Sequence, residues 1–130
     1  MAFTWQFESK DCIAIQLTDQ VAYQDIIDFL EQIRIETSKH PVIYELIRCS
    51  EDLYVELSSE EALIVANKLK ENLSLHSGGA MVFICATDHI YGLCRQLGMR
   101  VETDAMPVEV FRTEAEAREW FKEIRSLDTV

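Results

Sequence analysis

The amino-acid sequence predicts a single α/β domain, residues 1–130, built on a largely parallel, mixed sheet of about five strands with four helices. Short β-branched or aromatic runs alternate with longer segments whose apolar residues recur at helical spacing. No linker, repeat or low-complexity segment divides the chain. Its 48% hydrophobic and 27% charged content is typical of a globular core with a charged surface. The expected order is ββαβαβαβα, with an antiparallel first strand at one edge.

The first two elements are expected to form a hairpin. Phe3, Trp5 and Phe7 alternate with polar neighbours, which is the pattern of a strand with one buried face. A turn at 9–11 leads to a second strand at 12–17. We expect Phe3 and Trp5 to pack in the core, with a homodimer seam along this edge strand as the alternative.

The next segment predicts a helix capped by Thr18 or Asp19, because apolar residues form one helical stripe before Pro41 ends the pattern. The stripe consists of Ala22, Ile26, Phe29, Leu30 and Ile33. The β-branched and aromatic run 42–47 follows and predicts a strand covered on both faces.

Two capping boxes mark later helices. Ser58 with Glu61 begins one helix, and Thr113 with Glu116 begins the last, after a strand at 108–111. A short helix between them is capped at 87–88, with a predicted end near Gly98.

The run 80–86 is the most hydrophobic, so we expect it to be the central strand. Gly78 and Gly79 precede it and predict a tight turn. Phosphate-binding loops place their glycines between a strand and a following helix, so this pair does not predict such a loop.

The charge balance argues against nucleic acid as a partner. Twenty-three acidic and twelve basic residues give a net charge of −11, which repels phosphate backbones and anionic lipid surfaces. The simpler explanation of this negative charge is that it keeps the protein soluble, and the alternative is an acidic docking surface. The first residues do not form a signal peptide and no apolar run could span a membrane, so we expect a cytoplasmic protein.

The cysteines and histidines do not predict a metal centre, a cofactor or catalysis. Cys12, Cys85 and Cys94 lie in apolar runs, where cysteine acts as a small hydrophobic residue. Cys49 is expected in a loop before the acidic stretch 50–52, which would raise its pKa and leave it inert. The histidines are scattered, whereas a zinc site needs converging ligands.

The carboxyl ends of the parallel strands are the expected ligand-binding edge. Arg112 is the strongest anion-binding candidate there, with Asp88, Tyr91 and Arg95 on the helix before it. These four residues form a candidate ligand site. The alternative is that Arg112 pairs with a local acid such as Glu114 or Glu116.

Segments 86–98 and 108–121 resemble the C-terminal half of SpoIIAA-like proteins, which are related to the STAS domains. The shared features are a Tyr-Gly-x-x-Arg stretch and a Val-Phe-Arg stretch followed by acids, alanines and a tryptophan. Residues 44–48 resemble a family strand that often reads aromatic-Asp-Leu-Arg, with Glu45 in place of the aspartate. The resemblance implies the SpoIIAA topology, which lipid-binding SEC14-type modules share.

In anti-sigma factor antagonists of this family, a phosphorylated serine lies within Asp-Ser-x-Gly at the start of a helix. Ser58 and Ser59 occupy the matching place, with Leu57 instead of the aspartate and no glycine. The resemblance thus implies Ser58 or Ser59 as a phospho-switch, although Glu60 would oppose an added phosphate.

Three functions follow from these observations. The first is a non-catalytic regulatory module that docks a protein partner or a second copy of itself. The second is a carrier of a small molecule or lipid, which the SEC14-type kinship suggests. An enzyme is the third, and the missing catalytic constellation disfavours it.

Overall fold

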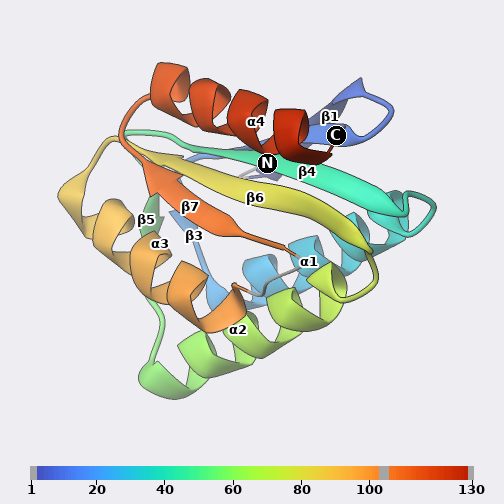
Figure 1. Ribbon diagram of the computed structural model, residues 1–130. Coiled ribbons are helices and arrows are strands. Elements are labelled where there is room, and N and C mark those ends of the chain that lie inside the picture. Colours follow the sequence, from blue (N-terminus) through green and yellow to red (C-terminus); the bar gives the residue numbers. More distant parts are fainter. Residues whose placement is uncertain (1–2, 103–105, 129–130) are drawn as a thin grey trace.

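The computed structural model describes residues 3–102 and 106–128, and its main element is one mixed five-stranded sheet (Figure 1). The strand order is β1-β2-β4-β6-β7. The first pair is antiparallel, and every later pair is parallel. The strands are β1 (Phe3–Ser9), β2 (Cys12–Leu17), β4 (Val42–Cys49), β6 (Gly78–Cys85) and β7 (Val108–Phe111). The predicted α/β class, with its antiparallel edge strand, is confirmed.

Four helices cover the two faces of this sheet unequally. Figure 1 shows α1, α2 and α3 on one face and α4 alone on the other. The helices are α1 (Tyr23–Thr37), α2 (Ser59–Leu73), α3 (Asp88–Val101) and α4 (Glu114–Asp128). Within the described ranges no helix is long and apolar enough to cross a membrane.

Alternation along β4 divides the core into two layers. Ile43 and Ile47 face α1, α2 and α3, whereas Tyr44 and Leu46 face α4 and contact the cluster around Phe121. Because a large buried apolar side chain contributes about 1.5–3 kcal/mol, both layers hold the helices firmly on the sheet.

The start of α1 differs from the prediction. A short strand, β3 (Gln20–Val21), precedes the helix and pairs in parallel with β5 (Tyr54–Val55) in a separate two-stranded sheet. The cap is therefore Ala22 and not Thr18 or Asp19. The Asp25 carboxylate stabilises this end by accepting a hydrogen bond of 3.0 Å from the Ala22 amide.

The two glycines at 78–79 are the first residues of β6 and not a tight turn. Gly79 has φ +117°, and a Cβ there would lie 1.8 Å from the carbonyl oxygen of Ile43. The glycine is thus required by the close approach of β6 to β4. β6 is an interior strand, but β4 rather than β6 is the middle strand of the five.

The predicted capping box at the start of α2 is confirmed, and Thr113 caps α4 as predicted, although the Glu116 carboxylate accepts from the Thr113 hydroxyl rather than from its amide. The Ser58 hydroxyl accepts a hydrogen bond from the Glu61 amide at 3.1 Å, and the Glu61 carboxylate accepts one from the Ser58 amide at 2.9 Å. Thr113 Oγ1 likewise accepts from the Glu116 amide at 3.3 Å. The helix expected to end near Gly98 continues to Val101.

Phe3 and Trp5 of β1 pack in the core, as expected, whereas Phe7 on the same strand is exposed. The ring of Phe3 stacks on Phe29 of α1 at a centroid distance of 4.3 Å, and Trp5 meets the same ring edge-on at 5.8 Å. These contacts fix the edge hairpin to α1.

Candidate functional site

An apolar cavity of about 240 Å³ lies between the sheet and the layer formed by α1, α2 and α3. Most of its wall is aliphatic or aromatic and comes from both the strands and the helices. Representative lining residues are Ile15, Phe29, Leu30, Ile47, Leu69 and Ile90. Since an engineered apolar cavity of about 150 Å³ stays dry and binds benzene, this one has room for a larger organic molecule.

The cavity reaches the surface between α2 and α3. Most lining residues are buried or half-buried, but Ser59 on α2 and Gln96 and Arg100 on α3 are exposed. Ala62, one turn further along α2, is half-buried at the same opening. A small molecule therefore has a route into the cavity between these two helices.

Glu45 forms part of the cavity wall. Strand alternation places it on the same face as Ile43 and Ile47, and only 4% of it is exposed. Its register partners on the neighbouring strands are Ile13 and Met81, both fully buried. The sequence therefore places one carboxyl group inside an apolar layer.

No residue in the described part of the chain forms a hydrogen bond or ion pair with the Glu45 carboxyl group. Burial alone raises the pKa of Glu45 from its ordinary 4.5 to about 7. A buried polar group without a partner is costly, so such a group in a cavity wall marks a candidate binding site.

Three other polar side chains of the cavity wall already have partners. The Thr37 hydroxyl donates to the Ile33 carbonyl at 2.8 Å, and the Asn72 amide donates to the Leu30 carbonyl at 3.0 Å. Nδ1 of His76 lies 2.7 Å from the His40 carbonyl oxygen. Glu45 thus differs from these neighbours in being available to a molecule in the cavity.

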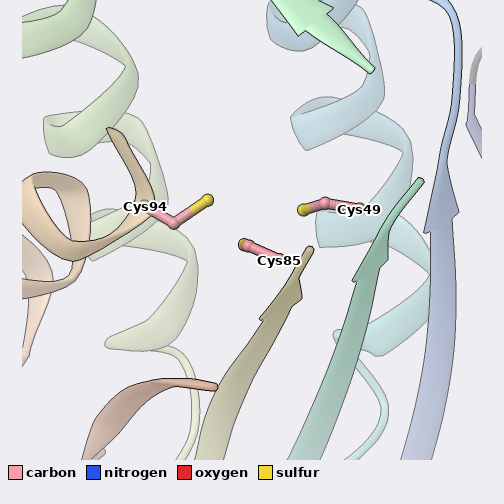
Figure 2. Close-up of side chains that lie close together, drawn as sticks. All are labelled: Cys49, Cys85 and Cys94. Carbon is pink, nitrogen blue, oxygen red and sulfur yellow. The ribbon is translucent and has the colours of Figure 1, made fainter. Parts of the chain in front are cut away.

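Three cysteines meet at the carboxyl ends of the central strands. Figure 2 shows the thiols of Cys49, Cys85 and Cys94 turned toward one another, and the three sulfur atoms lie within 4.8 Å of each other. Cys49 ends β4, Cys85 ends β6, and Cys94 lies on α3. All three are buried, and Cys49 and Cys94 also line the cavity.

This cluster corrects two expectations. Cys49 is not in a loop, because it is the last residue of β4 and is 6% exposed. Its pKa is raised, as predicted, but the main cause is the hydrogen bond with the Cys85 thiol rather than the acidic stretch 50–52. The same hydrogen bond lowers the pKa of Cys85, and hydrogen bonding to both neighbours raises the pKa of Cys94.

Sequence spacing did not reveal this cluster, because no two of the cysteines form a CxxC pair. A weaker signal was present: Cys49 and Cys85 end runs predicted to be parallel strands, and such ends share one edge of a sheet. The fourth cysteine, Cys12, is buried on the opposite face near Tyr44, where desolvation raises its pKa to about 11.

The four residues of the predicted ligand site lie together on the surface. Arg112 forms an ion pair of 2.8 Å with Asp88, and its guanidinium lies 4.1 Å from the ring centre of Tyr91. Arg95 lies 5.9 Å from the same ring. The cluster is separate from the cavity, since none of the four lines it. Ligand binding there stays a prediction.

The acids expected to pair with Arg112 have other partners. Glu114 contacts Arg48 at 2.5 Å and Arg118 at 3.3 Å. Glu116 accepts a hydrogen bond from the Thr113 hydroxyl. The local acid that pairs with Arg112 is therefore Asp88, from the candidate site itself.

The two serines of the predicted phospho-switch have different surroundings. Ser58 is the exposed cap of α2 and is held by Glu61, whereas Ser59 is the first residue of the helix and lies at the cavity opening. Phosphorylation at either serine stays a prediction.

The fold is similar to that of SpoIIAA. The anti-sigma factor antagonist SpoIIAA in its unphosphorylated form superposes with a TM-score of 0.62 at 15% identity, over 95% of this chain and 100% of that chain. The Bacillus cell-fate determinant SpoIIAA in its phosphorylated form gives a TM-score of 0.53 at 15% identity, over 92% and 98%.

A structure from Shewanella loihica PV-4 is also similar. This uncharacterised DUF3478 protein with a SpoIIAA-like fold gives a TM-score of 0.54 at 17% identity, over 92% of both chains. No family model and no curated protein matches the sequence. The chain thus has a SpoIIAA-like fold, as the sequence resemblance implied.

Proposed function

We propose that this protein binds a small, mainly apolar molecule in the cavity, with Glu45 contacting a hydrogen-bonding group of that molecule. The observation that supports it is a buried carboxyl group, without a partner in the described chain, in the wall of an apolar cavity of about 240 Å³. Ligand sites commonly combine such an apolar wall with a few placed polar groups. The role is binding and not catalysis.

The chemistry of Glu45 restricts the class of ligand. An alcohol or amine can donate a hydrogen bond to the Glu45 carboxylate and recover part of its desolvation cost. A fatty-acid anion would place a second carboxylate beside Glu45, and the net charge of −11 would oppose its approach. The expected ligand is therefore a neutral or cationic molecule with an apolar body.

A fluorescent probe of this class tests the proposal. N-phenyl-1-naphthylamine is uncharged and has one N–H donor, and its emission rises when it leaves water. We expect saturable binding to the wild type and much weaker binding to Ala62→Phe, which narrows the cavity opening. Leu63→Phe is the matched control, because Leu63 follows on the same helix but is exposed and lies outside the cavity.

Equal emission from the two variants, or none from the wild type, would contradict binding in the cavity. Circular dichroism of each variant checks that the helix content is unchanged. A Glu45→Gln variant then tests the polar contact: it should keep the cavity but change the affinity for the N–H donor.

A regulatory protein-interaction role is the second function that we consider. The SpoIIAA-like fold favours it, together with the exposed position of Ser58 at the start of α2. Phosphorylation of Ser58 would add a doubly charged group beside Glu60 and Glu61 and disturb the cap of α2. Self-association along the edge strand β1 and a cytoplasmic location belong to this same proposal.

The second role has its own test. Protein isolated from its own cells is examined by mass spectrometry for phosphate on Ser58 or Ser59. Phosphate at either position would support the regulatory role, and unmodified serine under all growth conditions would count against it. Light scattering across a concentration series separately tests self-association.

A further inference from the structure

We propose that Cys49, Cys85 and Cys94 form a three-sulfur site for one soft, thiophilic metal ion with a filled d shell, Cu(I) or Zn(II). The site goes beyond the cavity ligand proposed above and does not depend on it. It rests on the convergence of three buried thiols from three separate elements of the fold.

The geometry fits such an ion. Three sulfur atoms that bind one ion at about 2.3 Å each lie at most about 4 Å apart. The sulfur atoms of the cluster are within 4.8 Å of one another, so small side-chain rotations close the difference. Two of the three positions are rigid, because Cys49 and Cys85 are register partners on adjacent interior strands.

The donor set selects the class of ion. Thiolates favour soft ions such as Cu(I) and Zn(II) over Mg²⁺ or Ca²⁺, which prefer oxygen. The cluster contains no carboxylate or histidine among the residues that the structure describes. Cu(I) accepts three sulfur ligands without a fourth, whereas Zn(II) would take a fourth ligand from the cavity that Cys49 and Cys94 line.

Binding is a simple exchange of protons for the metal. Each of the three S–H groups loses its proton to solvent as its metal–sulfur bond forms, and no oxidation or reduction takes place. The metal charge offsets part of the charge on the three thiolates.

The test uses the full chain, reduced and kept without oxygen. Cu(I) and, separately, Zn(II) are titrated against a chromophoric chelator, and the bound metal is examined by X-ray absorption. We expect one ion per chain with three sulfur neighbours at about 2.3 Å. For Cu(I) we expect three sulfurs alone, and for Zn(II) three sulfurs with one lighter atom; either result supports the site.

Single Cys→Ala variants at 49, 85 and 94 should lose binding in competition with the chelator. Cys12→Ala is the matched control and should keep it, since Cys12 is also buried but lies on the α4 face. Failure of both metals to bind the wild type would overturn the proposal, as would binding that the three variants retain. The X-ray absorption result on the wild type decides the matter even where a variant does not fold.

Discussion

Glu45 and Met81 are register partners on the parallel strands β4 and β6, and both side chains are buried on the face covered by α1, α2 and α3. A carboxyl group therefore lies beside a thioether in the middle of an apolar layer. The only described feature that gives this group room for a partner is the cavity in whose wall it lies. The first prediction follows from this relationship.

Glu45→Gln should remove a pH-dependent loss of stability. Folding raises the pKa of Glu45 from 4.5 to about 7, so the folded state holds the proton more tightly than the unfolded chain. Its contribution to the free energy of unfolding is intact below pH 4.5, falls as pH rises from 4.5 to about 7, and is lowest above that. The shift corresponds to about 3 kcal/mol.

Urea unfolding across this pH range measures the effect. Above pH 7 the Glu45→Gln protein should be the more stable of the two, by up to about 3 kcal/mol. His76 and Arg100 also line the cavity, but they are present in both proteins, so the comparison isolates the change at Glu45. The exposed Glu119→Gln serves as control. A variant that is less stable than the wild type above pH 7 would show that Glu45 has a stabilising partner.

Glycine substitutions at 79 and 92 should have opposite effects. In Gly79→Ala the new Cβ would meet the Ile43 carbonyl oxygen at 1.8 Å, at a φ of +117°, so the variant should be severely destabilised or fail to fold. Gly92 lies inside α3, and nothing lies within 4 Å of an added Cβ. Gly92→Ala should raise the free energy of unfolding by up to about 1 kcal/mol. Thermal unfolding compares the two, and a stable Gly79→Ala protein would refute the close approach of β4 and β6.

Ser58→Ala should lower the free energy of unfolding by about 1 kcal/mol, because it removes the hydroxyl that caps the Glu61 amide. Ser59→Ala is the neighbouring control, since Ser59 is exposed and is not the cap. Chemical denaturation of both variants measures the difference. An equal effect of the two substitutions would argue against the capping role of Ser58.

The surface cluster around Arg112 predicts a weak site for anions. Inorganic phosphate at low ionic strength should raise the melting temperature of the wild type more than that of Arg112→Ala. The ion pair with Asp88 competes for the same guanidinium, so Asp88→Asn should strengthen the response. A phosphate-induced shift that is intact in Arg112→Ala would exclude this site.

The elements of the fold were predictable because their signals are local. Alternation at Phe3, Trp5 and Phe7 gave the edge strand, and the Ser58–Glu61 pair marked the start of α2. The predicted cap of α1 was wrong, because residues 20–21 form the short strand β3 and the helix begins only after it. β3 forms by pairing with β5, which is distant in the sequence. Short strands of this kind carry no periodic signal.

The candidate cavity was not predictable in the same way. Glu45 lies in a run that was expected to be buried on both faces. The free-energy cost of burying its carboxyl group depends on which groups the helices place around it, and these groups come from distant segments of the chain. The cysteine cluster likewise arises from strand register, which pairs Cys49 with Cys85. By contrast, Arg112 and Asp88 were placed together correctly, because both follow the carboxyl ends of neighbouring strands.

The most direct test of the central claim is native mass spectrometry of the protein isolated from its own cells without detergent. The proposal predicts that wild-type protein carries a small organic molecule, and that Ala62→Phe carries less of it or none. Release of that molecule on acid denaturation then allows its identification. A wild-type protein with the bare polypeptide mass, or an equal added mass in both proteins, would contradict binding in the cavity.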